Sequence, residues 1–194
     1  MNHYYEKLFE YVAETTSMIE DSKVRCRQYF KPLFVPKDTI IEAAGAVPAF
    51  HNFIVSGYVR NFHLDSEGNE ITTDLNDGSR FFTSYLHFMN QTVSNENIHC
   101  ITDCELLRIS FQDAASPEMQ NENRKDYTIK LFEKLLVEEK QRIYDHANLT
   151  AEQRYQKFLH DKPNIIQNVP LNYIASYLGI TQRHLSRLRK EIST

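Results

Sequence analysis

Three regions of this 194-residue chain differ in how hydrophobic and polar residues are spaced. From Asn2 to about Arg27, apolar residues recur at helical intervals with acidic residues between them, which predicts a helix. The following region, roughly 80 residues long, alternates apolar and polar positions in short runs, which predicts strands. Beyond residue 116 the spacing is again that of helices.

Turn residues divide the strand region. The segments SEGN at 66–69 and NDGS at 76–79 contain glycine, which adopts positive φ at little cost, and Thr102-Asp103 separates a last strand pair. Short strands with a turn every 8–12 residues or so are typical of a small antiparallel roll or barrel. We therefore predict an α+β fold with a β-roll domain and N-terminal helix in residues 1–115.

A long helix is expected over residues 116–147. Ser116 and Pro117 suit a helix start, and no glycine or proline follows before residue 147. A helix of this length, about 45 Å, is too long for one small roll to cover. It either folds back on the roll as an ordinary amphipathic helix or, as we favour, pairs with its twin in a homodimer. Its apolar face is expected to hold Ile129, Phe132, Leu136, Ile143 and Ala147, with Leu131 and Leu135 beside them.

Residues 148–194 are expected to form a DNA-binding domain. Within it, the segment LNYIASYLGITQRHLSRLRK at 171–190 meets the steric demands of a helix-turn-helix. Ala175 is small where the second helix crosses the first, and Gly179 suits a turn with positive φ. Thr181 is placed to cap the second helix. The side chains expected to fill the space between the helices are Ile174, Leu178, Ile180, Leu185 and Leu188.

The outer face of the second helix, residues 181–191, has the chemistry of a recognition helix. Arginine can form two hydrogen bonds with guanine, and glutamine with adenine, in the major groove. We therefore expect the residues at the start of this helix to contact bases in the major groove. The full expected interface is Thr181, Gln182, Arg183, His184, Ser186, Arg187, Arg189 and Lys190, of which Ser186, Arg189 and Lys190 suit phosphates.

The charge distribution favours double-stranded DNA as a partner. Residues 150–194 hold seven Lys or Arg and three acidic residues, a net +4 within a chain of net −4, so the remainder carries −8. An acidic body with a basic end is typical of binding to a polyanion at that end. An alternative is a protein-interaction module that keeps a relic helix-turn-helix, although a relic need not keep these cations together on one face.

Other classes of protein are less compatible with the sequence. It contains no apolar run long enough to span a membrane, and its start lacks the features of a secretion signal, so we expect a cytoplasmic protein. The odd number of cysteines favours reduced thiols, and we expect no cofactor and no metal. The rival enzyme hypothesis is a cupin-like metal site, for which the candidate ligands are His51, His63, His87 and His99 with Glu70 or Glu96.

The order of β-roll, long helix and helix-turn-helix resembles the Crp/Fnr family of bacterial transcription regulators. The segment IASYLGITQRHLSRLRKEI carries most of the resemblance, and FIVSGYVRNF and ITDCELLRIS are similar to the family's roll strands. The resemblance implies a homodimer that binds near-palindromic DNA, with RNA polymerase as a further candidate partner. Carried over residue by residue, the family's base-contacting positions fall on Gln182, Arg183 and Arg187.

The sequence also departs from this family. The Gly-Glu and Arg-Ser pairs that hold a cyclic nucleotide are missing, so we expect no cAMP binding. Either the roll binds another small molecule, using Arg80, Tyr85 and His87, or it serves only as a dimer scaffold. Because the sequence stops two residues after Ile192, we also expect the β-hairpin wing that usually follows the recognition helix to be lacking.

Overall fold

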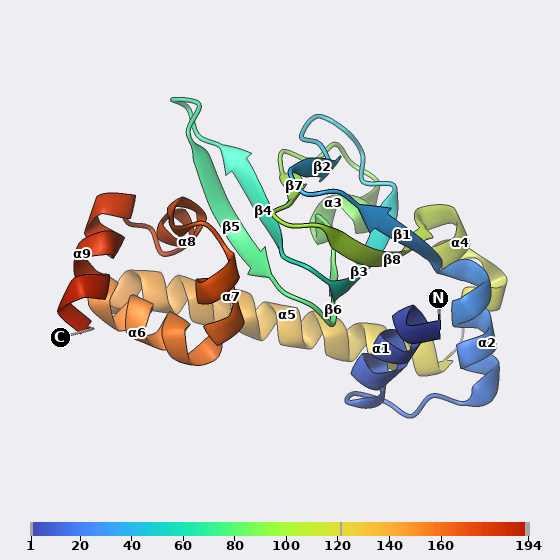
Figure 1. Cartoon of the computed structure of the whole chain (residues 1–194). Coiled ribbons are helices and arrows are strands. Elements are labelled where there is room, and N and C mark those ends of the chain that lie inside the picture. The colour runs from blue at the N-terminus through green and yellow to red at the C-terminus, as the bar shows by residue number, and fades with distance from the viewer. Residues whose placement is uncertain (1, 121, 193–194) are drawn as a thin grey trace.

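The computed structural model describes residues 2–120 and 122–192, in which a β-roll and a cluster of C-terminal helices lie along one long helix (Figure 1). The N-terminal helical region is interrupted, because α1 (Asn2–Ala13) and α2 (Glu20–Tyr29) are separate helices. Our prediction of one helix over this region was wrong. The break follows Ala13 at Thr15, Thr16 and Ser17, whose β-branched or hydroxyl side chains disfavour a helix interior.

In the described residues, the roll is built from two antiparallel sheets of four strands each, as predicted. The first sheet has the order β1-β8-β3-β6 and the second β2-β7-β4-β5, so β5 lies at an edge. The strands are β1 (Lys31–Val35), β2 (Thr39–Glu42), β3 (Phe50–Ser56), β4 (Val59–Leu64), β5 (Glu70–Asn76), β6 (Arg80–Phe82), β7 (Asn97–Cys100) and β8 (Cys104–Ser110), with the short helix α3 (Tyr85–Asn90) before β7.

Strand alternation gives each sheet two different faces. On β3, Ile54 is buried between the two sheets, whereas Phe53 and Val55 belong to a second core on the outer face of the first sheet. That outer core is covered by α1, α2 and the beginning of the long helix. Gly57 joins β3 to β4 at φ +103°, where a Cβ atom would lie 2.6 Å from the Asp103 carbonyl oxygen, so only glycine fits there.

The long helix begins later than predicted. Residues Pro117–Met119 form the 3₁₀ helix η1, and the continuous helix is α5 (Glu122–Asn148). The Ser116 hydroxyl donates to the Asp113 carbonyl, at the end of the preceding helix α4 (Phe111–Ala115), and does not cap the helix that follows. Serine here therefore ends one helix, which the local sequence did not distinguish from starting another.

The C-terminal helices are α6 (Ala151–Asp161), α7 (Pro163–Asn168), α8 (Leu171–Tyr177) and α9 (Gln182–Ile192). Thr150 and Gln153 form a capping box at the start of α6, and Pro163 occupies the first turn of α7. The predicted α+β fold class is confirmed. The absence of a wing after α9 concerns positions outside the described residues.

Candidate nucleic-acid interface

The turn between α8 and α9 is shaped by the residues that the sequence marked. Ala175 is 1% exposed where the helices cross, and Gly179 has φ +67°. The Thr181 hydroxyl accepts a hydrogen bond of 3.2 Å from the His184 amide, which caps α9. The apolar side chains buried between the helices include Ile174, Leu178, Leu185 and Leu188, each 4% exposed or less.

This packing fixes which side of α9 faces outward. Because Leu185 and Leu188 are buried, the helical period places Gln182, Arg183 and Arg187 on the solvent side, and all three are exposed. Of the other predicted interface residues, Thr181, Arg189 and Lys190 are exposed, and His184 and Ser186 are half-buried. Gln182, Arg183, Ser186, Arg187 and Lys190 thus share the outer side of α9, whereas His184 and Arg189 flank the buried face and Thr181 precedes the helix.

One acid lies close to the basic side. Arg187 Nε is 3.7 Å from Glu191 Oε1, one turn further along α9, with both side chains exposed. The sequence interval 182–190 holds no acid, but the helix repeat brings Glu191 within reach of Arg187. Such an exposed pair is weak in water, so Arg187 can exchange its partner for a base or phosphate at little cost.

The helix-turn-helix rests on the edge strand β5 of the roll, a contact that the sequence did not predict. The Thr72 amide donates to the Ser176 hydroxyl at 2.9 Å, and that hydroxyl donates to the Glu70 carbonyl at 3.1 Å. Leu75 of β5 is buried in the same apolar cluster as Ile174 and Leu185. Helix α8 therefore covers an edge that would otherwise present unpaired backbone groups to solvent.

A buried arginine strengthens this contact. The Arg60 guanidinium, 3% exposed, lies 3.5 Å from the centre of the Tyr173 ring on α8, and its Nε donates to His99 Nδ1 at 3.1 Å. Burial, together with the Arg60 charge, lowers the pKa of His99, which keeps this ring neutral as an acceptor. The sequence signal was slight, because Arg60 is one of three polar residues in β4 and nothing in that strand sets it apart.

The long helix α5 is apolar on two opposite sides. Leu131 is 7% exposed and packs with Leu135 against the roll, whereas Ile129, Leu136 and Ile143 are 56%, 57% and 64% exposed. At about 100° per residue, the exposed residues lie nearly opposite Leu131. Our prediction that Leu131 lies beside them on the helix was therefore wrong. The exposed side chains repeat every seven residues and form a stripe that the single chain does not cover.

The three residues predicted to form an effector pocket are only partly brought together. Arg80 and Tyr85 line a cleft of about 420 Å³ between the roll and α5. His87 is not among its described lining residues, because its position on α3 turns it toward Thr92, whose hydroxyl lies 2.9 Å from its Nδ1. The Arg80 guanidinium lies 3.4 Å from Glu138 and 3.9 Å from Asp74.

Beside this cleft, the roll interior contains a polar network that sequence analysis missed. Asn52 donates to Glu42 Oε1 at 2.9 Å and accepts two bonds of 3.1 Å from Arg108. Thr83 and the Ser84 amide also donate to the Glu42 carboxylate. Burial raises the pKa of Glu42 to about 7, although these hydrogen bonds oppose the shift. Their separation along the chain hid the network from local patterns.

The described residues contain no group of three or more His, Cys, Asp or Glu side chains placed to hold a metal ion. Candidate ligands of the metal-enzyme hypothesis have other partners: His51 Nε2 lies 3.2 Å from the Tyr85 hydroxyl, and His99 contacts Arg60. Cys26, Cys100 and Cys104 are free thiols. No helix in the described part of the chain is long and apolar enough to cross a membrane.

No protein-family model and no curated protein sequence matches this chain. Its fold is similar to that of CLP, the c-di-GMP-responsive global regulator of Xanthomonas campestris, at 17% identity over 88% of this chain and 89% of that chain, with a TM-score of 0.69. It is also similar to a CooA mutant from Carboxydothermus hydrogenoformans, at 18% identity over 96% and 84% of the two chains, with a TM-score of 0.70.

A third similar structure is a protein from Eubacterium rectale assigned to the Crp/Fnr family of transcription regulators. It is 19% identical over 91% of this chain and 84% of that chain, with a TM-score of 0.70. The resemblance noted in the sequence is thus confirmed for the fold: this chain has the fold of the Crp/Fnr regulators.

Proposed function

We propose that this protein is a transcription regulator of the Crp/Fnr type that binds DNA through α9. The observation that carries the proposal is the exposed side of α9, where Gln182, Arg183 and Arg187 lie together on a helix held by a buried helix-turn-helix core. A helix of this size fits the major groove, and these side chains can form paired hydrogen bonds with base edges. No described feature favours a metal enzyme in its place.

The regulator acts as a homodimer paired through α5. The exposed stripe of Ile129, Leu136 and Ile143 repeats every seven residues, the spacing at which two helices bury their apolar residues against each other. A second copy related by two-fold symmetry would present a second α9, and the operator would then be near-palindromic.

The roll cleft does not suit a cyclic nucleotide. Its described lining includes the acidic residues Asp74, Glu96 and Glu139, and Arg80 is already paired with Asp74 and Glu138. A cyclic phosphate entering this cleft would meet carboxylates, and it would have to break the arginine's existing ion pairs. We therefore expect no stabilisation by cAMP.

A selection of bound fragments from random double-stranded DNA tests the proposed function. Wild type is expected to enrich a two-fold symmetric site, and Arg187→Ala to lose roughly 1–3 kcal/mol per base contact and specificity at one position of each half-site. Lys190→Ala is the matched control, because loss of a phosphate contact weakens all sequences alike. The proposal would be contradicted if wild type enriched no sequence at low salt. It would also be contradicted if DNA binding did not weaken as salt is added.

A further inference from the structure

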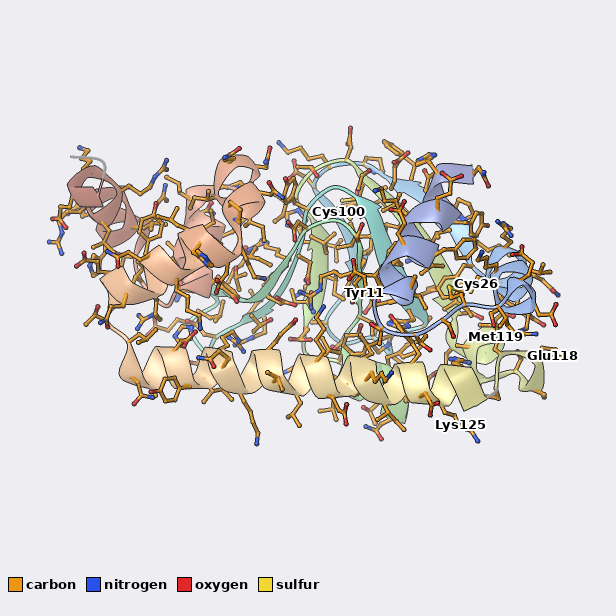
Figure 2. All side chains as sticks on the ribbon, turned by 90° about the horizontal axis from the view of Figure 1, so that it is seen from below. Tyr11, Cys26, Cys100, Glu118, Met119 and Lys125 are labelled. Atoms are coloured by element: carbon orange, nitrogen blue, oxygen red, sulfur yellow. The ribbon has the colours of Figure 1, made fainter. Side chains whose placement is uncertain are left out.

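An apolar cavity of about 180 Å³ lies beneath the N-terminal helices, beside the cleft between the roll and α5. Its floor is the outer face of the first sheet, and its walls come from α1, α2, α3 and the start of α5. Two wall residues, Cys26 on α2 and Met119 on η1, lie at the end of the molecule where α2 approaches α5 (Figure 2). Phe81, Tyr85 and Phe132 line both the cavity and the cleft.

The size and lining of the cavity suit a small apolar group. Apolar side chains from several elements surround it, among them Leu8, Val12, Phe30, Phe81, Phe88 and Ile109. Empty apolar cavities of roughly 150 Å³ bind benzene, so this one has room for a single aromatic ring or a short alkyl chain with a small polar group. Protein interiors are otherwise closely packed, so a void of this size is unusual.

One polar atom in the described wall of the cavity has no hydrogen-bond partner. The Tyr127 hydroxyl is buried, and no described group hydrogen-bonds to it. Such an orphaned hydroxyl costs stability that a ligand's oxygen acceptor would restore. His51 is half-buried, and desolvation lowers its pKa to about 3, with the Arg124 charge adding to the shift, so this ring is neutral.

The charge of the cavity wall has one sign. Its described lining includes Arg25 and Arg124 but no aspartate or glutamate. Arg124 Nη1 donates to the carbonyl oxygens of Ala114 and Met119. Arg25 donates to the Ser22 hydroxyl at 3.3 Å and forms no ion pair with any described residue. The Arg25 guanidinium at this wall favours an anion, and a single charge is cheaper to bury than a double one.

We propose that this cavity binds a small monocarboxylic acid with an apolar body, such as a monocyclic aromatic carboxylate. The apolar body occupies the space above Phe81, the carboxylate lies toward Arg25, and the Tyr127 hydroxyl donates to a carboxylate oxygen. This site does not depend on DNA binding, because none of its described lining residues lies beyond Phe132.

Phenylacetate is the test ligand, and its neutral isostere phenylacetamide is the control. Binding to the full wild-type chain is measured without DNA by isothermal calorimetry and ligand-observed NMR. We expect saturable binding of one phenylacetate per chain, roughly tenfold or more tighter than phenylacetamide, because only the acid pairs with a guanidinium. Equal affinity for the two compounds would overturn the proposal. So would the lack of saturable binding of phenylacetate, benzoate and octanoate at concentrations up to about 10 mM, which is a generous limit for ligands this small.

Matched variants locate the site. Arg25→Gln should weaken phenylacetate binding roughly fivefold or more and leave phenylacetamide unchanged, whereas Arg27→Gln, two residues along α2 and exposed, should change neither. Tyr127→Phe should also weaken phenylacetate binding, whereas Tyr144→Phe on the exposed side of α5 should not. Equal effects of a variant and its control would place the ligand elsewhere. If a variant does not fold, the acid and amide comparison on wild type decides the matter.

Discussion

The helix-turn-helix and the β-roll have interiors of different chemistry. The cluster around α8 and α9 consists of hydrophobic side chains, whereas the roll also encloses Glu42, Asn52 and Arg108 in a hydrogen-bonded network. Apolar packing follows from the spacing of residues within a short segment. A polar network depends on partners far apart in sequence, since Asn52 and Arg108 are separated by 56 residues. A short sequence window can therefore predict the apolar packing of the helix-turn-helix but not the polar network of the roll.

The largest change in stability is expected from Leu185→Ala, which tests the apolar packing of the helix-turn-helix. Leu185 is fully buried between α8 and α9, so its truncation leaves a cavity and should lower the free energy of unfolding by about 2–5 kcal/mol. Urea unfolding followed by circular dichroism measures the change. Arg183→Ala, on the exposed side of the same helix, should change stability by less than about 0.5 kcal/mol. Equal destabilisation by the two variants would show that α9 is not held by its apolar side.

The sequence predicted the helix-turn-helix nearly residue by residue, because Ala175, Gly179 and Thr181 act on neighbours within one or two turns. It also predicted the turn at Gly68, which has positive φ, whereas in the turn at 76–79 the residue with positive φ is Ser79 and not Gly78. It did not predict the contact of Ser176 with β5 or the unpaired hydroxyl of Tyr127, because both depend on tertiary packing. The start of α5 was missed for a local reason, since Ser116 can bond backward as well as forward.

Glu42→Gln should change how the stability of the protein depends on pH, through the polar network inside the roll. The pKa of Glu42 rises from 4.5 to about 7 on folding, so between these values the folded state holds a proton that the unfolded state releases. Wild-type stability therefore falls as pH rises through this range. At pH 8 the variant should be more stable than wild type, by on the order of 1–3 kcal/mol, because no charge is buried.

Urea unfolding at pH 5 and pH 8 measures this difference, which should shrink toward zero at the lower pH. Glu67→Gln is the control, since Glu67 is exposed in the hairpin turn between β4 and β5. Among the described residues, the buried polar side chains lie in the roll and not in α6 to α9, so this pH response is expected from the roll. A stability gain for Glu42→Gln that was the same at both pH values would contradict the assignment of a buried, titrating carboxyl group.

The smallest effect concerns the place where the helix-turn-helix meets α5. A Cβ atom at Gly179 would lie 3.1 Å from Cε1 of His146, whereas at Gly68, also at positive φ, it would meet nothing within 4 Å. Both Gly→Ala changes introduce left-handed strain of about 1 kcal/mol, but only Gly179→Ala must also displace a ring. It should therefore be the more destabilising of the two in urea unfolding. Removing the ring in a His146→Ala background should reduce the cost of Gly179→Ala to that of Gly68→Ala. If the cost stayed unchanged in that background, backbone strain alone would account for it, and His146 would not help to position the turn that precedes the recognition helix.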